Sequence, residues 1–91
     1  MTRLEVIANR SVQEDVIEAL SKALDGLEYT VIPVAHGVGV RAKKLGTPVW
    51  PEENFVLVAY VERAEPALEA LRSLKRRFSR EGISFFTVRA E

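Results

Sequence analysis

Apolar and polar positions follow two different periods in the first part of the chain. Residues 2–8 alternate between apolar and polar side chains, as a half-buried strand does. The next segment changes to helical spacing, and its apolar stripe consists of Val12, Val16, Ile17, Leu20, Ala23 and Leu24. Ser11 and Glu14 have the spacing of a capping box, so we expect this helix to begin near Ser11 and to stop at Asp25-Gly26.

The remaining pattern predicts two strands, a helix and a last strand. Residues 29–35 and 54–62 are rich in β-branched and aromatic side chains, and residues 83–89 are similar. Between them Pro66 suits the first turn of a helix whose stripe consists of Leu68, Leu71, Leu74 and Phe78. The order β-α-β-β-α-β predicts an α+β, ferredoxin-like sandwich with two helices on one face of a four-stranded antiparallel sheet. Pro33 cannot donate to a ladder, so the second strand belongs at a sheet edge.

The third strand, residues 54–62, is apolar on both faces. Phe55, Leu57 and Ala59 share one face, and Val56 and Val58 share the other. Helices on one side of the sheet can cover only one of these faces, and monomers rarely expose large apolar patches. We therefore expect a homo-oligomer with sheet faces buried against one another. The alternative is a register in which Tyr60 and Thr30 make the open face polar enough for water.

Composition limits the classes of function that need to be considered. The 91 residues suit a single domain spanning 1–91, and the 13 basic residues balance the 13 acidic ones, so neither nucleic acid nor an anionic membrane is an expected partner. The absence of cysteine excludes disulfides and thiolate chemistry. No apolar run is long enough for membrane insertion, and the sequence after Met1 has no leader pattern, so we expect a cytoplasmic protein.

The segment 36–53 between the second and third strands is the candidate for function, because loops of this length in small domains are usually functional or disordered. Gly37 and Gly39 at its start would turn with positive φ and leave N–H groups free for an anion. Arg41, Lys43 and Lys44 follow within reach and would suit a phosphate or carboxylate. The glycine pair has an alternative interpretation as a tight exit from an edge strand.

Three further side chains in this segment have candidate roles. Trp50 lies between two prolines and would either stack on a nucleobase or pin the loop. We expect Glu52 and Glu53 to be solvated or to pair with Lys43 and Lys44. His36 belongs to the candidate ligand site, but a lone histidine without other nitrogen or sulfur ligands does not make a transition-metal site, so no metal is expected.

The H-G-V-G run at 36–39 and the apolar strand N-F-V-L-V-A-Y-V at 54–61 resemble the PII-like proteins of nitrogen regulation and signal transduction. The run L-G-T-P-V-W-P-E-E-N at 45–54 is similar to short members of that family. The resemblance implies a homotrimer that binds a small anionic ligand in clefts between subunits, with Gly37 and Gly39 donating backbone N–H groups. It also implies that the ligand is an adenine nucleotide, which would be a signal and not a cofactor. The loop would then engage a target protein. No tyrosine lies between His36 and Asn54, so the tyrosine modification of typical members is excluded.

Other uses of this topology fit the residues less well. Acylphosphatases have a Gly-Val-x-x-Arg loop after the first strand, whereas residues 37–41 follow the second, and no catalytic set appears elsewhere. We therefore do not expect an enzyme. The RNA-binding version of the fold has a basic-Gly-aromatic opening that this chain lacks. The main alternative is a regulatory module that binds an amino acid or another metabolite at a subunit interface.

Overall fold

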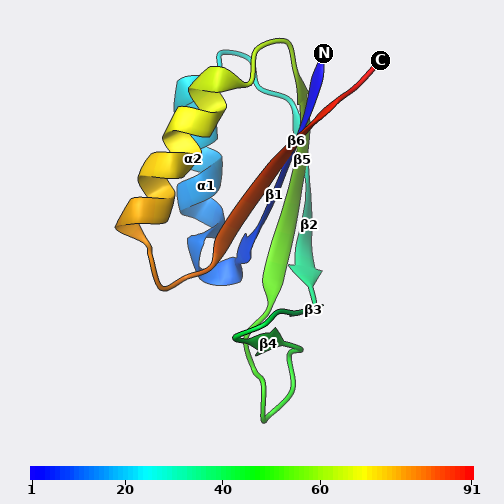
Figure 1. Cartoon of the computed structure of the whole chain (residues 1–91), viewed down its shortest axis with the longest axis vertical. Helices are drawn as coiled ribbons and strands as arrows, with labels where there is room; N and C mark the ends of the chain where they lie inside the picture. The colour runs from blue at the N-terminus through cyan, green and yellow to red at the C-terminus, as the bar shows by residue number, and fades with distance from the viewer.

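The computed structural model describes the whole chain, residues 1–91, as an open sheet with helices on one side (Figure 1). The sheet consists of β1 (Thr2–Asn9), β2 (Tyr29–Ala35), β5 (Asn54–Val61) and β6 (Ile83–Arg89). The helical layer consists of η1 (Arg10–Val12), α1 (Gln13–Ala23) and α2 (Glu65–Arg77). The strand order is β2-β5-β1-β6, and all neighbours are antiparallel. This is the predicted ferredoxin-like α+β arrangement.

The core is one cluster of 14 buried residues between the sheet and the helices. The helices contribute Val12, Val16, Leu20, Ala67, Leu71 and Leu74 to this cluster, which confirms the apolar stripes read from the sequence. The sheet contributes alternate residues of its strands: Leu4, Val6, Ala8, Phe55, Leu57, Ala59, Val61 and Ile83. No helix in the protein combines the length and the apolar character that a membrane crossing demands.

Pro33 lies on an edge strand, as its missing N–H requires. Only β5 pairs with β2, and their register runs regularly from Tyr29 to Ile32 and then shifts before Ala35. The proline therefore falls where the ladder is already irregular, and the edge position predicted for this strand is confirmed.

The beginning of the first helix differs from the predicted capping box. The amide oxygen of Asn9 accepts a hydrogen bond from the Ser11 N–H at 3.0 Å, and the 3₁₀ turn η1 precedes α1. The Ser11 hydroxyl donates instead to Glu81 at 2.8 Å. The capping-box prediction was wrong because Asn9, at the end of β1, is itself a preferred capping residue, while Glu81 comes from a distant turn.

The second face of the sheet has no helix over it. Register pairs Ile7 with Val56 and with Ser84, so these three side chains share the open face. Ile32 pairs with Val56 and belongs to the same face, whereas Val31 pairs with the buried Leu57 and faces the helices. Large apolar side chains that remain about half exposed on this face are Ile32, Tyr60, Phe86 and Val88.

Candidate functional site

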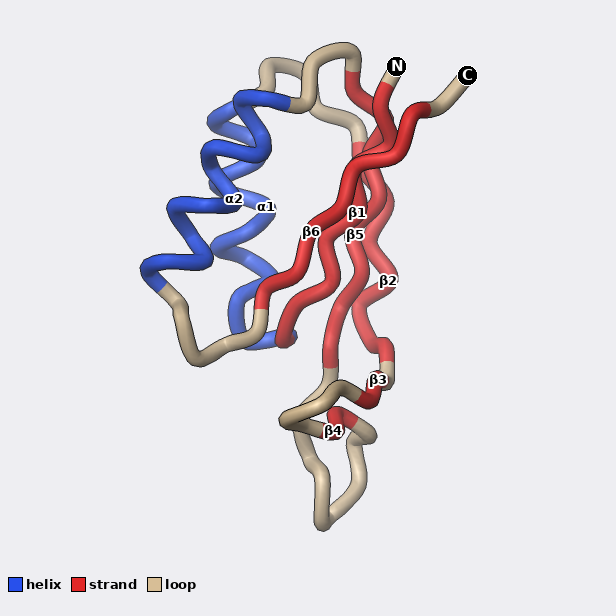
Figure 2. Tube along the Cα trace, in the orientation of Figure 1, coloured by secondary structure: helices blue, strands red, loops and turns tan.

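The segment 36–53 has an ordered structure of its own beyond the end of the sheet (Figure 2). Two short strands, β3 (Gly37–Val38) and β4 (Lys43–Lys44), pair in antiparallel fashion, and the Gly39 N–H donates to the Ala42 carbonyl at 2.8 Å to close the turn. A second turn follows, in which the Thr47 N–H donates to the Trp50 carbonyl at 3.0 Å. The sequence had shown no periodicity here because these elements are only two residues long.

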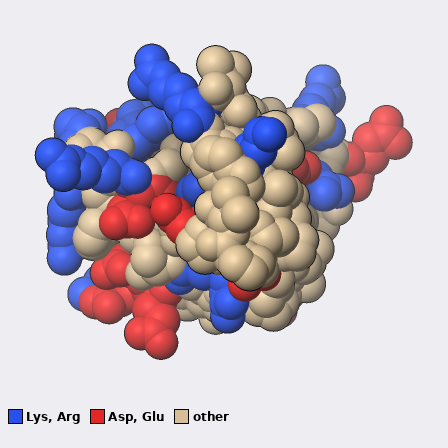
Figure 3. Space-filling model, turned by 90° about the horizontal axis from the view of Figure 1, so that it is seen from below, with Lys and Arg blue, Asp and Glu red and all other residues tan.

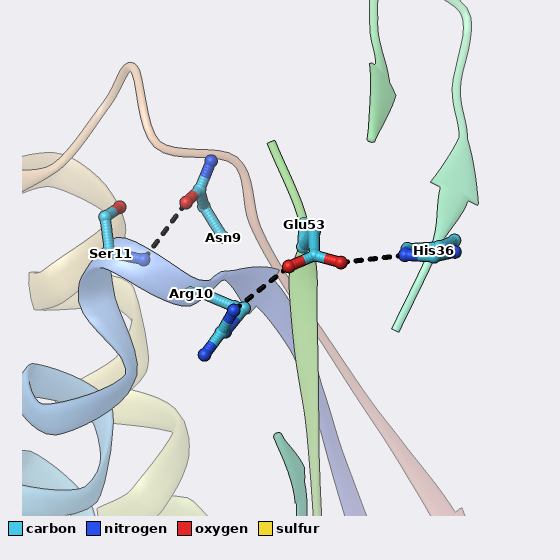
Figure 4. A network of polar contacts seen from close by, with 5 residues as sticks. All are labelled: Asn9, Arg10, Ser11, His36 and Glu53. Atoms are coloured by element: carbon cyan, nitrogen blue, oxygen red, sulfur yellow. Dashed lines mark hydrogen bonds and ion pairs between the residues drawn. The ribbon is translucent and has the colours of Figure 1, made fainter. Parts of the chain in front are cut away.

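Charged side chains tie the base of this segment to the end of β1, and we call Arg10, His36 and Glu53 the loop latch (Figure 4). One carboxylate oxygen of Glu53 lies 3.0 Å from an Arg10 guanidinium nitrogen, and the other lies 2.8 Å from His36 Nε2. Beside the latch, Glu52 accepts from the amide nitrogen of Asn9. Glu52 is exposed, as one of the two expectations for it required. The expected pairing of Glu52 and Glu53 with lysines was wrong, because the end of β1 and the turn after it bring other partners closer.

The contacts of the latch favour the ionised form of Glu53. The hydrogen bond from His36 holds the pKa of Glu53 below its usual value of 4.5, partial desolvation opposes this shift, and Arg10 adds to it. The ionised carboxylate is therefore the form that the folded protein favours.

A cleft of about 480 Å³ lies where the base of the loop passes the open face of the sheet. The residues that line it come from β1, the β3–β4 hairpin, β5 and the start of β6. They are Ile7, Gly37, Val38, Gly39, Arg41, Ala42, Lys44, Asn54, Gly82 and Ser84. Two of these residues are cations and none is a carboxylate. The cleft therefore favours an anion by charge alone.

Of the predicted site residues, Gly37, Gly39, Arg41 and Lys44 line this cleft. Lys44 reaches across it, because a Cβ added to Gly82 would lie only 3.2 Å from the lysine ammonium. The close approach is possible because Gly82 has no side chain and has a φ of 61°, which suits glycine.

The other predicted site residues lie elsewhere. His36 belongs to the latch, and the ammonium of Lys43 lies 5.7 Å from the centroid of the Trp50 ring. Trp50 also donates its backbone N–H to the Thr47 hydroxyl at 3.0 Å. These contacts are made within the loop, and none of the three side chains lines the cleft.

The predicted backbone conformation of the glycine pair was wrong. Neither Gly37 nor Gly39 has a positive φ; within this segment only Gly46 does, at 65°. The Gly39 N–H is also occupied by the Ala42 carbonyl. The pair lies in a tight hairpin directly after the edge strand β2, because β3 pairs with β4 and the backbone of β3 stays extended. This agrees with the alternative interpretation, a tight exit from an edge strand.

Six lining residues were missed: Ile7, Val38, Ala42, Asn54, Gly82 and Ser84. Ile7, Gly82 and Ser84 are far from the loop in sequence, so no local pattern indicated them, whereas the other three lie within the loop or directly after it. Asn54 is the most informative, because its amide oxygen is buried and has no hydrogen-bond partner in the protein. A buried acceptor of this kind is normally satisfied by a water or a ligand donor.

No protein-family model matches this sequence, and no curated protein does. Solved structures do share its fold. CPII, a nitrogen regulatory PII-like protein from Thiomonas intermedia K12 bound to ADP, AMP and bicarbonate, superposes with a TM-score of 0.73 at 20% identity, over 96% of this chain and 82% of that chain. A protein from Thermus thermophilus described as a PII-like signalling protein gives 0.66 at 20% identity, over 96% and 83%.

At such identities the likeness shows the fold and nothing finer. A de novo designed protein, Foldit4, also superposes, with a TM-score of 0.59 at 13% identity over 99% of this chain and 98% of that chain. The chain therefore has the ferredoxin-like fold found in PII-like proteins, as its sequence pattern predicted. What it binds must be argued from the cleft itself.

Proposed function

We propose that this protein is a PII-like regulatory protein that binds an adenine nucleotide in the cleft at the base of the 36–53 segment. The observation that carries the proposal is the lining of that cleft, which contains Arg41 and Lys44 and no carboxylate. Guanidinium and ammonium groups together suit a phosphate chain, because one binds in bidentate fashion and the other acts as a compact charge.

The rest of the lining suits the non-phosphate part of such a ligand. Ile7 and Val38 provide apolar surface, and the free amide oxygen of Asn54 provides an acceptor for an exocyclic amine or a hydroxyl. The volume of about 480 Å³ falls in the usual range for small-molecule sites. The structure of CPII, which shares the fold, contains ADP and AMP.

Assembly as a homotrimer forms the second part of the proposal. Ile7 and Ser84 line the cleft and also belong to the open, apolar face of the sheet. A second copy that covers this face would therefore complete the wall of the cleft, so that the ligand lies between subunits. Burial of the half-exposed apolar side chains on this face provides the driving force.

The third part of the proposal is that the 36–53 segment signals to a target protein. The cleft and the segment share the β3–β4 hairpin, so a ligand held by Arg41 and Lys44 acts directly on the hairpin. The segment presents Val40 in the turn of this hairpin and Val49 beyond the hairpin; the first is fully exposed and the second is largely exposed. Apolar side chains on a protruding loop are suited to contact another protein.

The experiment is a thermal-shift titration with ADP, AMP and ATP. At a nucleotide concentration of about 100 times Kd, mass action stabilises the native state by about 2.7 kcal/mol, which raises the Tm of a domain of this size by roughly 15 °C. We expect this shift to disappear in Arg41→Ala and in Lys44→Ala.

Lys43→Ala is the matched control, because Lys43 is the neighbouring cation in β4 but lies over Trp50 instead of lining the cleft. It should respond to nucleotide like the unaltered protein. No shift with any of the nucleotides at millimolar concentration would contradict the proposal. A nucleotide shift that survives in Arg41→Ala would place the nucleotide away from the loop and would also contradict the proposed site.

A further inference from the structure

The strand β6 forms an edge of the sheet that nothing in the chain covers. It pairs with β1 on one side only, whereas β5 and β1 each have two neighbours. An edge strand carries backbone N–H and C=O groups that face outward without partners, and these can pair with another extended chain.

The ladder with β1 identifies which groups these are. The Asn9 N–H donates to the Gly82 carbonyl, and the Ala90 N–H donates to the Met1 carbonyl, one at each end of the strand. In an antiparallel pair the bonded residues alternate, so the groups that bond to β1 belong to the even-numbered residues from 82 to 90. The backbone groups of Ile83, Phe85, Thr87 and Arg89 therefore point away from the sheet.

The two edges of this sheet differ in how they are protected. The β2 edge contains Pro33 and a register shift, both of which hinder further pairing. β6 has no proline and no register shift, and its run from Ile83 to Val88 contains no charged residue. Five of the six residues in that run are β-branched or aromatic, so this edge is suited to pairing.

Cations flank this edge, and their charge favours an acidic strand over a basic one as its partner. The Lys75 ammonium lies 5.7 Å from the centroid of the Phe85 ring, and Arg89 is the last residue of β6. Neither forms an ion pair within the chain, whereas the nearby Glu5 is bound by Arg3. Lys and Arg side chains also gather on the side of the molecule where α2 ends (Figure 3).

We propose that the free edge of β6 binds an extended acidic segment of a partner protein as a fifth strand of the sheet. Backbone hydrogen bonds supply affinity in this mode, and charge supplies selectivity. A second copy of β6 would bring the Lys75 and Arg89 cations of both chains to one seam, and this repulsion disfavours self-pairing. The edge residues Phe85, Thr87 and Arg89 do not line the nucleotide cleft, which reaches the β6 region only at Gly82 and Ser84, so this proposal does not depend on the proposed function.

The probe is an end-blocked seven-residue peptide of alternating valine and glutamate, matched in length to β6 and followed by NMR titration. We expect slower amide exchange at Phe85 and Thr87, whose N–H groups point outward, and no change at Phe86, whose N–H already bonds to β1. The matching peptide of valine and lysine should bind at least about fivefold more weakly. It loses an exposed ion pair with the cations of the edge and replaces that attraction with repulsion between like charges.

Thr87→Pro is the decisive variant, because proline removes an outward N–H without breaking the β1 ladder. It should weaken binding of the glutamate peptide about tenfold while the thermal shift with nucleotide stays unchanged. Thr87→Val keeps the N–H and should bind like the unaltered protein. The glutamate peptide with alternate backbone nitrogens methylated tests the same hydrogen bonds without altering the protein, and it should not bind.

Three results would overturn the proposal. One is equal binding of the glutamate and lysine peptides, and another is unchanged binding by the methylated peptide. The third is a decrease in the mass of the native assembly in Thr87→Pro, because this would mean that a second copy of the chain already occupies the edge.

Discussion

The proposed burial of the open sheet face can be tested at Phe86, the largest side chain on it that has no polar group. The residue is 53% exposed in the isolated chain. A phenylalanine carries roughly 200 Å² of surface, so complete burial in an interface would remove about 100 Å² from water. At about 25 cal/mol per Å², this contributes about 2.5 kcal/mol per subunit.

Phe86→Ala should therefore weaken a trimer by about 2 kcal/mol for each subunit, or about 6 kcal/mol for the assembly. That corresponds to a factor of about 10⁴ in the dissociation constant. The dissociation constant of a trimer has units of concentration squared, so the protein concentration at half-assembly varies with its square root. That concentration should therefore rise about 100-fold.

Sedimentation equilibrium over a range of protein concentrations measures this change. Val40→Ala is the matched control, since Val40 is fully exposed but lies in the loop and away from the face, and its assembly should be unchanged. A trimer with the same half-assembly concentration in Phe86→Ala, or a chain that stays monomeric at millimolar concentration, would refute the reasoning from the open face.

Three other predictions concern stability and the latch. Leu71→Ala removes a fully buried side chain from the core and should lower the free energy of unfolding by about 3 kcal/mol in urea denaturation. The pKa of Glu53 is lowered in the folded state, so the latch stabilises the protein above pH 4.5, and this stabilisation is lost as the pH falls through the lower folded value. Trp50 fluorescence should change in that acidic range. Gly46→Ala would place a Cβ 2.5 Å from a carboxylate oxygen of Glu53 and should open the latch, which would increase amide exchange throughout the loop. Gly26→Ala is the control, because Gly26 has the same φ of 65° but lies in open space, and this variant should cost only about 1 kcal/mol of strain.

The hydrophobic pattern was sufficient for the fold because each element has a clear local signal. Alternation fixed the faces of β1 and β5, and helical spacing fixed the stripes of α1 and α2. Pro33 identified an edge strand from its chemistry alone. The capping box failed because two candidate caps, Asn9 and Ser11, compete within three residues, and a distant partner, Glu81, decided between them.

For the candidate site, the sequence by itself determined the location and the sign of charge: a loop between the second and third strands with glycines and cations at its base. Only the tertiary structure decided which side chains meet. Lys44 and Lys43 are neighbours in sequence, but strand alternation sends one to Gly82 and the cleft and the other to Trp50. The far wall of the cleft comes from β1, β5 and β6, and residues that are remote along the chain become neighbours only through sheet register, which no local pattern specifies.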